Sequence, residues 1–456
     1  MRSSFAALAP AIGDHDHGVW SYVAGGGQRI LPPSVACGDG DSKSHEVFQR
    51  RTLVSSGSVT PNLFSYPDYR RLWLVGGVSY VVRWLEMLAF GLFAYQVTGS
   101  AFVVAVLSML RLVPMGLFGA FLGVAADRFE RRSALIMMVA VSLAGVLTLA
   151  VLARFDAIKV WHLAVAAFVN GICWAADNPV RRTMLGDVAG HQRMASAMSL
   201  DIATNNACRI IGPMLGGALL AQFGIVSIFT LAAALYGASL VAALRLRVRH
   251  APVDGARPSF TASLREGFAW LRGDRRLIGI FTITVIFNVF GWPFLSMVPI
   301  IGTDYLHLDP QAVGLLASCD GAGGLLGAAL IAMLASPASQ GRIYVTAVAL
   351  YLVMVIAFAT ASFAPLAAFM LLLIGVAAVG FAIMQTTLVY RHSPAAMRAR
   401  LLGLLSMCIG TGPLGFLYLG FLADVLTPRV GTVALAAQGI LALLFTRRFW
   451  APVLRP

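Results

Sequence analysis

Residues 123–132 read Gly-Val-Ala-Ala-Asp-Arg-Phe-Glu-Arg-Arg, a short charged segment between two long apolar stretches. The first stretch ends at Ala126, and the second begins near Ser133. The hydrocarbon core of a bilayer is about 30 Å thick, so a helix needs roughly 20 apolar residues to cross it. A charged turn between two stretches of this length predicts a tight cytoplasmic loop of a multi-pass membrane protein.

The composition of the chain favours the same class. Of the 456 residues, 59% are hydrophobic and 12% are charged, whereas soluble domains average about 25% charged residues. No ten-residue alternation of polar and apolar residues repeats along the chain, which argues against a transmembrane barrel. Twelve stretches can cross a bilayer: 73–96, 102–126, 133–153, 160–180, 197–222, 224–245, 277–301, 312–335, 343–361, 364–390, 401–424 and 430–446. We predict an all-α membrane protein with twelve transmembrane helices.

The basic residues predict which side of the membrane each loop faces. If the N-terminus is cytoplasmic, only three of the 34 Lys and Arg residues lie in outer loops, namely Arg154, Lys159 and Arg429. Three more lie inside spans, and the remaining 28 lie in inner segments, as expected for cytoplasmic loops. We therefore expect both termini on the cytoplasmic side. We also expect the membrane to be a bacterial inner membrane. The net charge of +14 is then a topology signal, because a nucleic-acid partner would require the basic residues to gather on one face.

The chain divides into five segments around these spans. We expect a disordered cytoplasmic tail (1–65), which could instead precede the true start of the gene, a six-helix bundle (66–245), a cytoplasmic linker (246–276), a second six-helix bundle (277–446) and a cytoplasmic tail (447–456). In the linker, the apolar residues Phe260, Leu264, Phe268 and Leu271 recur at helical spacing. This pattern predicts an amphipathic helix lying on the inner membrane surface.

The two predicted bundles share sequence features. Gly212-Pro213 in the fifth span recurs as Gly412-Pro413 in the eleventh, and Arg132 and Arg181 recur at an offset of 210 residues as Arg342 and Arg391. Two six-helix pseudo-repeats are a known transporter architecture, in which the substrate binds between the repeats near the middle of the membrane.

The opening segment resembles the signature loop of the major facilitator superfamily, Gly-x-x-x-Asp-Arg-x-Gly-Arg-Arg. The matching residues are Gly123, Asp127, Arg128, Arg131 and Arg132, whereas Glu130 stands where the family prefers Gly. The resemblance implies the major facilitator fold and a cytoplasmic gate at this loop. The alternative is a solvated, positively charged loop with no part in gating.

A second resemblance lies in the fifth span. Gly212, Pro213, Gly216 and Gly217 are similar to the Gly-Pro-x-x-Gly-Gly core of the antiporter motif of this superfamily. Proline frees a backbone carbonyl and glycines allow helices to approach closely, so we expect either a bend for alternating access or an ordinary packing interface. Four further stretches, in order over about 66–445, are Val97-Thr-Gly-Ser100, Arg111-Leu-Val-Pro114, Asn178-Pro-Val-Arg-Arg182 and Met397-Arg-Ala-Arg-Leu-Leu-Gly403. Together they resemble the branch of enterobactin exporters and macrolide efflux proteins.

Ionisable residues inside spans are costly to insert and are therefore candidates for function. Arg83, Arg111 and Arg209 lie near the predicted midplane, and the two carboxylates at comparable depth are Glu86 and Asp320. We expect Arg83, Arg111, Asn205, Arg209, Asn288 and Gln385 to line the substrate cavity.

The two carboxylates admit two hypotheses. Glu86, three residues after Arg83, could simply neutralise Arg83 or Arg111. Alternatively, a carboxylate in a low-dielectric cavity could exchange its proton for substrate, because burial disfavours the charged form. We favour Asp320 as the less obviously paired of the two. Three midplane arginines would suit an anionic or catechol-like substrate, unless ion pairs neutralise all of them.

Near the cytoplasmic end of the fourth span, Asp177 and Arg181 are four residues apart. With Asp127 and Arg131 they could form a charge cluster that breaks and re-forms during transport. We predict that these residues, with Gly123, Arg128 and Arg132, make up the cytoplasmic gate.

These features predict a secondary active transporter that exports small amphipathic molecules of the drug or siderophore class by alternating access, in exchange for protons, with antibiotic resistance or siderophore export as its role. The alternative is a proton-coupled uptake symporter of a small metabolite. No catalytic or ATP-binding motif is present, so we expect neither an enzyme nor an ATP-driven pump. We also expect no cofactor and no metal site, since the cysteines lack paired spacing. The expected partners are the substrate, protons and the lipid bilayer, and we expect a monomer.

Overall fold

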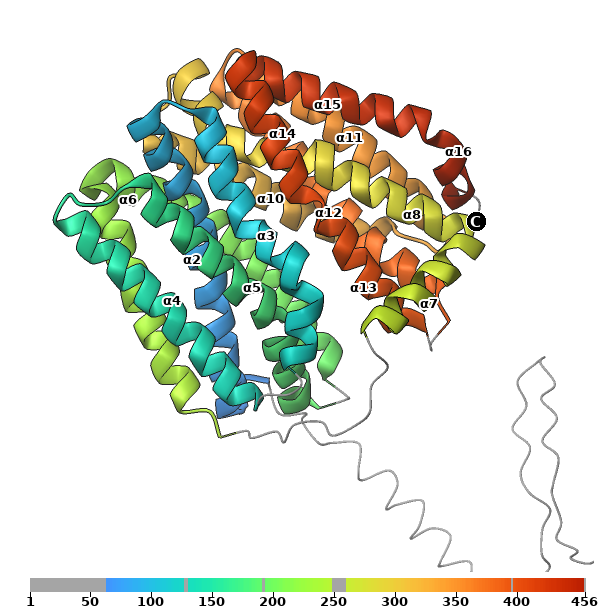
Figure 1. Ribbon diagram of the computed structural model, residues 1–456, viewed down its shortest axis with the longest axis horizontal. Helices are drawn as coiled ribbons and strands as arrows, with labels where there is room; N and C mark the ends of the chain where they lie inside the picture. The colour runs from blue at the N-terminus through green and yellow to red at the C-terminus, as the bar shows by residue number, and fades with distance from the viewer. Residues whose placement is uncertain (1–62, 127–129, 191–192, 248–259, 395–396, 455–456) are drawn as a thin grey trace, which may run out of the picture. The chain divides into compact units, whose positions relative to one another are not determined.

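The computed structural model describes residues 63–126, 130–190, 193–247, 260–394 and 397–454, and every regular element in these ranges is helical (Figure 1). The first group of helices is η2 (Leu63–Ser65), α2 (Pro67–Thr98), α3 (Ala101–Ala126), α4 (Arg131–Arg154), α5 (Val160–Ala189) and α6 (Met194–Leu244). A connecting helix, α7 (Phe260–Gly273), follows. The second group is α8 (Arg275–Ile286), η3 (Phe287–Gly291), η4 (Trp292–Met297), α9 (Val298–Ile300), η5 (Ile301–Tyr305), α10 (Pro310–Leu334), α11 (Gln340–Thr360), α12 (Ala364–His392), α13 (Arg398–Ile409), α14 (Gly412–Val425), α15 (Pro428–Phe445), α16 (Arg447–Trp450) and η7 (Ala451–Leu454).

Local sequence explains where several of these helices begin and end. Helix α2 starts with Pro67 in its first turn and ends at Gly99, whose left-handed backbone (φ 64°) lets its N–H reach the Tyr95 carbonyl. The Asp274 side chain accepts hydrogen bonds from two backbone N–H groups of the first turn of α8. Asp309 does the same for the Ala312 N–H at the start of α10. These side chains satisfy N–H groups that have no partner within the helix.

Helix α6 is 51 residues long, and its only residue with non-helical backbone angles is Gly224 (φ 71°, ψ −176°). A straight helix of that length would extend about 75 Å, more than twice the thickness of a bilayer core. The break at Gly224 therefore makes α6 two consecutive helices. The division that the sequence predicts near this residue is confirmed.

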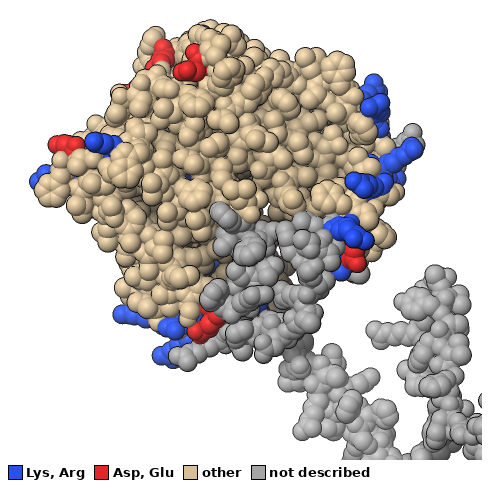
Figure 2. All heavy atoms as spheres, in the orientation of Figure 1, with Lys and Arg blue, Asp and Glu red and all other residues tan. Residues whose placement is uncertain are grey.

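Among the described residues, ten helices are long and apolar enough to cross a membrane. In this count α6 is taken once, and α3 is counted among the shorter apolar helices over 101–117. On the face shown in Figure 2, charged side chains gather around the rim and the broad surface between them is almost entirely uncharged. Large apolar side chains such as Met137, Trp161 and Phe421 are more than half exposed, as expected for residues that face lipid.

Helices α2–α6 pack mainly on one another, as do α8–α15, and the two groups meet where α6 packs on α10 and where α3 packs on α14 (Figure 1). Glycines allow these close approaches. A Cβ atom on Gly217 of α6 would lie 2.9 Å from the Cα atom of Gly314 in α10, and one on Gly116 of α3 would lie 2.9 Å from the Gly410 carbonyl oxygen. Small residues at such crossings let two backbones approach each other closely.

The predicted helix in the linker is confirmed as α7, and an ion pair of 2.5 Å between Glu266 and Arg400 connects it to α13. The segment that we expected to be a cytoplasmic tail, 447–456, is helical and packed over its described part. It forms α16 and η7, with Trp450 and Val453 buried, and the Trp450 indole donates a hydrogen bond of 2.7 Å to the Leu443 carbonyl. The tail predicted at 1–65 lies outside the described residues as far as residue 62.

Candidate functional site

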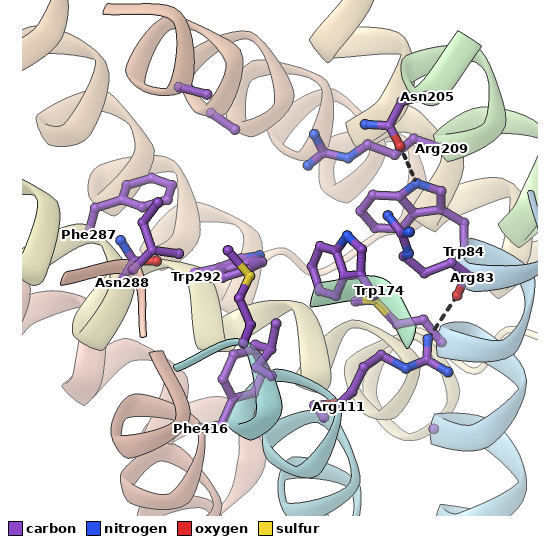
Figure 3. Close-up of a pocket in the computed structure, with 18 of the residues that line it drawn as sticks. Arg83, Trp84, Arg111, Trp174, Asn205, Arg209, Phe287, Asn288, Trp292 and Phe416 are labelled. Atoms are coloured by element: carbon purple, nitrogen blue, oxygen red, sulfur yellow. Dashed lines mark hydrogen bonds between the residues drawn. The ribbon is translucent and has the colours of Figure 1, made fainter. Parts of the chain in front are cut away.

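A cavity of about 290 Å³ lies between the two groups of helices (Figure 3). Residues of α2, α3, α5 and α6 form one wall, and residues of η3, η4 and α11–α14 form the other. The structure brings all six predicted cavity residues to this space: Arg83, Arg111, Asn205, Arg209, Asn288 and Gln385. The two predicted carboxylates do not line it.

Aromatic side chains form much of the remaining wall: Trp84, Phe90 and Trp174 from the first group, and Phe287, Trp292, Tyr351, Phe381 and Phe416 from the second. The rings of Phe287 and Phe381 stack with centroids 3.8 Å apart. The polar residues of the second group are held in place, because Gln385 Nε2 donates to Thr284 Oγ1 (2.9 Å) and Asn288 Nδ2 donates to the Thr284 carbonyl (2.8 Å). On the opposite wall, Trp84 Nε1 donates to Asn205 Oδ1 (3.4 Å). These aromatic residues could not be predicted, because nothing in the sequence distinguishes an aromatic residue of a cavity from one that faces lipid.

Glu86 is buried and paired. Arg111 Nη2 lies 3.1 Å from Glu86 Oε2, and the Asn170 amide donates to the same oxygen at 2.6 Å. Arg111 also donates to the Arg83 backbone carbonyl at 2.9 Å. Glu86 therefore forms its ion pair with Arg111 and not with Arg83, the other arginine considered for it. Glu86 also lines a separate crevice of about 460 Å³ between α4 and α5.

Asp320 forms an ion pair with Arg209, so α10 of the second group is joined to α6 of the first. Asp320, which we expected to be the less obviously paired carboxylate, therefore has an arginine partner of its own, whereas Glu86 has both Arg111 and Asn170. The sequence could not reveal the pair of Asp320 with Arg209, because the two residues are 111 positions apart on helices whose rotations were unknown. Both residues line a small cavity of about 40 Å³ that also contacts Trp84 and Pro299.

Arg83 differs from the other two arginines of the cavity. Its guanidinium lies over the Trp174 ring at 4.4 Å from the centroid and over the Tyr80 ring at 5.3 Å. The side chain is buried, and its Nε atom, like that of Arg209, has no hydrogen-bond partner among the described residues. Among the residues that the structure describes, no carboxylate oxygen lies within 4.0 Å of Arg83.

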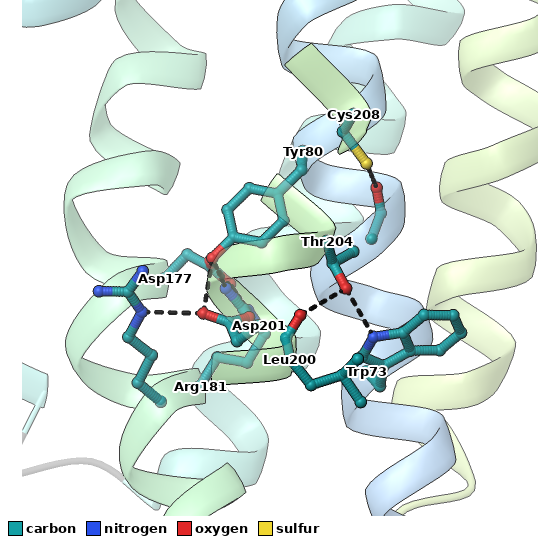
Figure 4. A network of polar contacts seen from close by, with 10 residues as sticks. Trp73, Tyr80, Asp177, Arg181, Leu200, Asp201, Thr204 and Cys208 are labelled. Atoms are coloured by element: carbon teal, nitrogen blue, oxygen red, sulfur yellow. Dashed lines mark hydrogen bonds and ion pairs between the residues drawn. The ribbon is translucent and has the colours of Figure 1, made fainter. Parts of the chain in front are cut away.

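A buried network surrounds Arg181 at the predicted gate (Figure 4). Arg181 is fully buried and pairs with Asp177 (3.1 Å) and with Asp201 (2.6 Å). The Tyr80 hydroxyl accepts from Arg181 at 2.7 Å and donates to Asp201 at 2.9 Å, and Arg182 adds a second pair with Asp201 at 3.0 Å. Asp201, Asn205 and Arg209 recur at four-residue spacing along α6 as a polar stripe, and neither Asp201 nor Tyr80 was among the predicted gate residues. The structure directs the three stripe residues to three different partners.

Two further predicted gate residues, Arg131 and Arg132, lie at the start of α4. Arg131 pairs with Asp187 of α5 at 2.9 Å, and Arg132 donates to the Leu244 carbonyl at 2.8 Å. Glu130, the departure from the family pattern, accepts from the Ser133 hydroxyl at 2.7 Å. Arg131 thus meets Asp187 and not Asp177. Gly123 lies within α3, and the predictions for Asp127 and Arg128 fall outside the described residues.

The glycines of the fifth span lie at helix contacts. A Cβ atom on Gly212 would lie 2.6 Å from the Trp84 Cβ atom, and one on Gly216 would lie 3.1 Å from the Leu85 carbonyl oxygen, so both residues face α2. Pro213 lies within a helical stretch of α6, whereas its counterpart Pro413 lies in the first turn of α14. Of the two alternatives for this motif, the structure displays close packing.

Further contacts join the two groups at the opposite end of the bundle from the Arg181 network. The Tyr95 hydroxyl near the end of α2 donates to Asp304 in η5. A Cβ atom on Gly91 would lie 3.3 Å from Pro299. Within the second group, Arg429 at the same end donates to the Ala359 and Ala361 carbonyls at 2.6 Å each. The groups are therefore closely apposed at this end.

Comparisons with known proteins place this arrangement in context. A family profile described as Major Facilitator Superfamily matches residues 72–416. The chain is 27% identical over 390 residues to the multidrug efflux pump Tap of Mycolicibacterium fortuitum, covering 80% of this chain and 92% of Tap. It is 21% identical to macrolide efflux protein A of Streptococcus pyogenes, covering 58% of this chain and 65% of that relative's length. The staphyloferrin A transporter of Staphylococcus aureus is 23% identical over 54% of this chain and 62% of its own length.

Solved structures show the same fold at low sequence identity. The nucleoside transporter NupG superposes with a TM-score of 0.63 at 17% identity, covering 84% of this chain and 99% of that chain. A POT family transporter superposes with a TM-score of 0.70 at 13% identity, covering 84% of this chain and 96% of that chain.

Proposed function

Because this chain belongs to the major facilitator superfamily, which consists of transporters and not enzymes, we propose that it exports small amphipathic molecules by alternating access. The observation that carries the proposal is the central cavity, whose two walls come from two separately packed groups of helices. A site built in this way opens to one side or the other when the groups rock against each other.

The proposed architecture has twelve spans in two pseudo-repeats. Counting α3 as a span and dividing α6 at Gly224 adds two helices to the ten long apolar ones. The repeats would be 66–245 and 277–446, joined by the linker at 246–276. Because 28 basic residues lie in the inner segments, we propose that both termini lie on the cytoplasmic side of a bacterial inner membrane.

In the proposed cycle, the structure corresponds to a state closed at the outer end. The Tyr95–Asp304 hydrogen bond and the contact of Gly217 with Gly314 hold the two groups together there. The charged residues at the cytoplasmic end would form the opposing gate, with Arg131–Asp187 and the Arg181 network as its described parts. Asp127→Asn tests this assignment in a transport assay: wild-type rates would remove Asp127 from the gate.

We assign export, and not uptake, from the relatives. The relatives with similar sequences include a multidrug efflux pump, a macrolide efflux protein and a staphyloferrin A transporter. Drug and siderophore molecules are therefore the substrate classes to test, and antibiotic resistance or siderophore export is the corresponding role.

We propose that export is driven by proton exchange. Asp320 and Glu86 each neutralise an arginine of the cavity, Arg209 and Arg111 respectively. Protonation of a carboxylate removes that attraction, and a buried carboxyl group favours the neutral form more than an exposed one does. Asp320 is the stronger candidate, because its ion pair connects the two groups of helices that must move.

The test is substrate-induced proton flux in everted membrane vesicles, using a panel of drugs and siderophores. Glu86→Gln and Asp320→Asn are compared with wild type, and Asp424→Asn, an exposed carboxylate on α14, serves as the control. We expect Asp320→Asn to abolish coupling, Glu86→Gln to reduce it and the control to retain it. Normal coupling in both test variants would reject these assignments.

The alternative is a proton-coupled uptake symporter of a small metabolite. The same vesicles separate the two, since an exporter accumulates substrate inside an everted vesicle when the interior is acidic and a symporter releases it. No cofactor is required in either case.

A further inference from the structure

We propose that Arg83 is an anion-recognition residue and that the cavity binds a substrate carrying one negative charge on a flat, aromatic body. This inference rests on the proposed transporter function and specifies its substrate class. It depends on the charges around the cavity, on the environment of Arg83 and on the positions of the aromatic rings.

The charges around the cavity and the adjoining network leave one cation without a partner. The five arginines are Arg83, Arg111, Arg181, Arg182 and Arg209, and the four carboxylates are Glu86, Asp177, Asp201 and Asp320. Glu86 pairs with Arg111, Asp320 pairs with Arg209, and Asp177 and Asp201 pair with Arg181 and Arg182. Within the described residues, every one of these carboxylates is thus committed to an arginine other than Arg83. Asp177 lines a small cavity together with Arg83 but forms its ion pair with Arg181. Arg83 is therefore the one arginine of this set that has no ion pair in the described part of the chain.

The environment of Arg83 makes an unpaired charge on this residue energetically costly. Only 8% of the residue is exposed, its Nε atom has no hydrogen-bond partner in the part of the chain that the structure describes, and its guanidinium lies over Trp174 (Figure 3). A buried charge is costly unless a counter-charge and hydrogen bonds compensate it. An anionic group in the cavity would supply both, because a guanidinium presents a planar set of donors that matches a carboxylate.

The aromatic rings argue against a cationic substrate. A cation binds over the face of an indole or phenyl ring, but arginines already occupy three such positions in the cavity. Arg83 lies over Trp174 (4.4 Å), Arg209 over Trp84 (5.2 Å) and Arg111 over Phe90 (5.4 Å). The lining of the cavity contains no Asp or Glu among the residues described. A cationic substrate would meet three guanidinium groups, of which only Arg83 has no ion pair among the described residues, and no carboxylate in the lining.

The opposite wall fits a flat apolar body. Phe287, Trp292 and Phe416 project from the second group of helices (Figure 3). No guanidinium of a described residue lies over their rings, and Phe287 stacks on Phe381. An aromatic ring inserted there would bury apolar surface while its charged end faces Arg83. The volume of about 290 Å³ is at the small end of ligand sites, which favours a compact molecule.

The test compares naphthalene-2-carboxylate with its cationic counterpart, 2-naphthylmethylammonium, by calorimetric titration of the purified full chain in detergent. We expect the anion to bind at least tenfold more tightly than the cation. Arg83→Gln should weaken anion binding by tenfold or more, Arg83→Lys should give an intermediate affinity, and Arg448→Gln, on the exposed turn α16, should leave binding unchanged.

Tighter binding of the cation, binding of neither probe, or unchanged anion binding in a folded Arg83→Gln protein would each overturn the inference. The comparison of the two probes on wild type stands even if Arg83→Gln does not fold. The binding measurement uses no proton gradient. If the protein binds the anion but shows no proton-coupled export, the proposed function is rejected and this inference stands.

Discussion

Arg209 of α6 and Asp320 of α10 form an ion pair between the two groups of helices, and Asp320 Oδ1 has no hydrogen-bond partner among the described residues. The pair adjoins the central cavity, because Arg209 also lines that space. A change in the charge of either residue therefore alters the electrostatics of both the central cavity and the interface between the two groups of helices.

Arg209→Gln and Asp320→Asn are each expected to destabilise the protein, because removal of one partner leaves a buried charge uncompensated, at a cost of about 3–5 kcal/mol. The double variant leaves no charge behind, so we expect it to recover most of the lost stability but not transport. Thermal unfolding of all three variants in detergent measures this coupling. Additive losses in the double variant would contradict it.

Arg181→Gln is expected to lower stability far more than Arg182→Gln. Arg181 is fully buried and pairs with two carboxylates, so its loss leaves both Asp177 and Asp201 short of a counter-charge. The Arg182 side chain is 41% exposed, and pairs accessible to solvent contribute at most about 1 kcal/mol. Unfolding midpoints of the two variants, which remove the same charge one residue apart, provide the comparison; equal midpoints would refute the assigned difference.

Gly76→Ala is expected to disturb the same network from α2. A Cβ atom on Gly76 would lie 2.7 Å from the Arg181 guanidinium carbon, so Arg181 would have to move away from its carboxylates. The neighbouring Gly77 is the matched control, because its nearest neighbour would be Thr204 Cγ2 at 3.7 Å. We expect Gly77→Ala to be tolerated or slightly stabilising, since Ala favours a helix over Gly by about 1 kcal/mol. Thermal unfolding and transport assays of both variants test this, and a tolerant Gly76→Ala would contradict it.

Gly217→Ala is expected to impair transport by keeping α6 and α10 apart. The added Cβ atom would lie 2.9 Å from the Gly314 Cα atom, and a backbone atom cannot move aside as a side-chain end can. Gly237→Ala, also in α6, has open space around the new atom and serves as the control. The initial rate of substrate uptake into everted vesicles should fall several-fold for Gly217→Ala only. Equal rates for the two variants would show that this contact does not limit closure.

Much of the fold was predictable from local composition. The apolar stretches matched the helices closely, and the amphipathic spacing after Phe260 predicted α7. Hydropathy predicts the spans well because each helix must satisfy the hydrogen bonds of its own backbone within the membrane, whatever its neighbours are. Gly224 marked the division of α6 for the same local reason, since glycine readily adopts a positive φ.

The cavity residues were predictable to the extent that charge inside a span is rare. Arg83, Arg111 and Arg209 stood out against apolar sequence, and all three line the cavity. The aromatic wall did not stand out, since Trp292 and Phe416 resemble any other apolar residue of a span.

The partner of each arginine depended on the packed helices. Successive residues on a helix are rotated by about 100°, so a small error in the rotation or tilt of one helix changes which side chains meet. Spacing along one chain favoured Glu86 with Arg83, yet the packing of α2 on α3 directs Glu86 to Arg111 and leaves Arg83 over Trp174. A local property of the chain therefore placed the charges at membrane depth, and the contacts between helices determined which of those charges remained without a counter-ion.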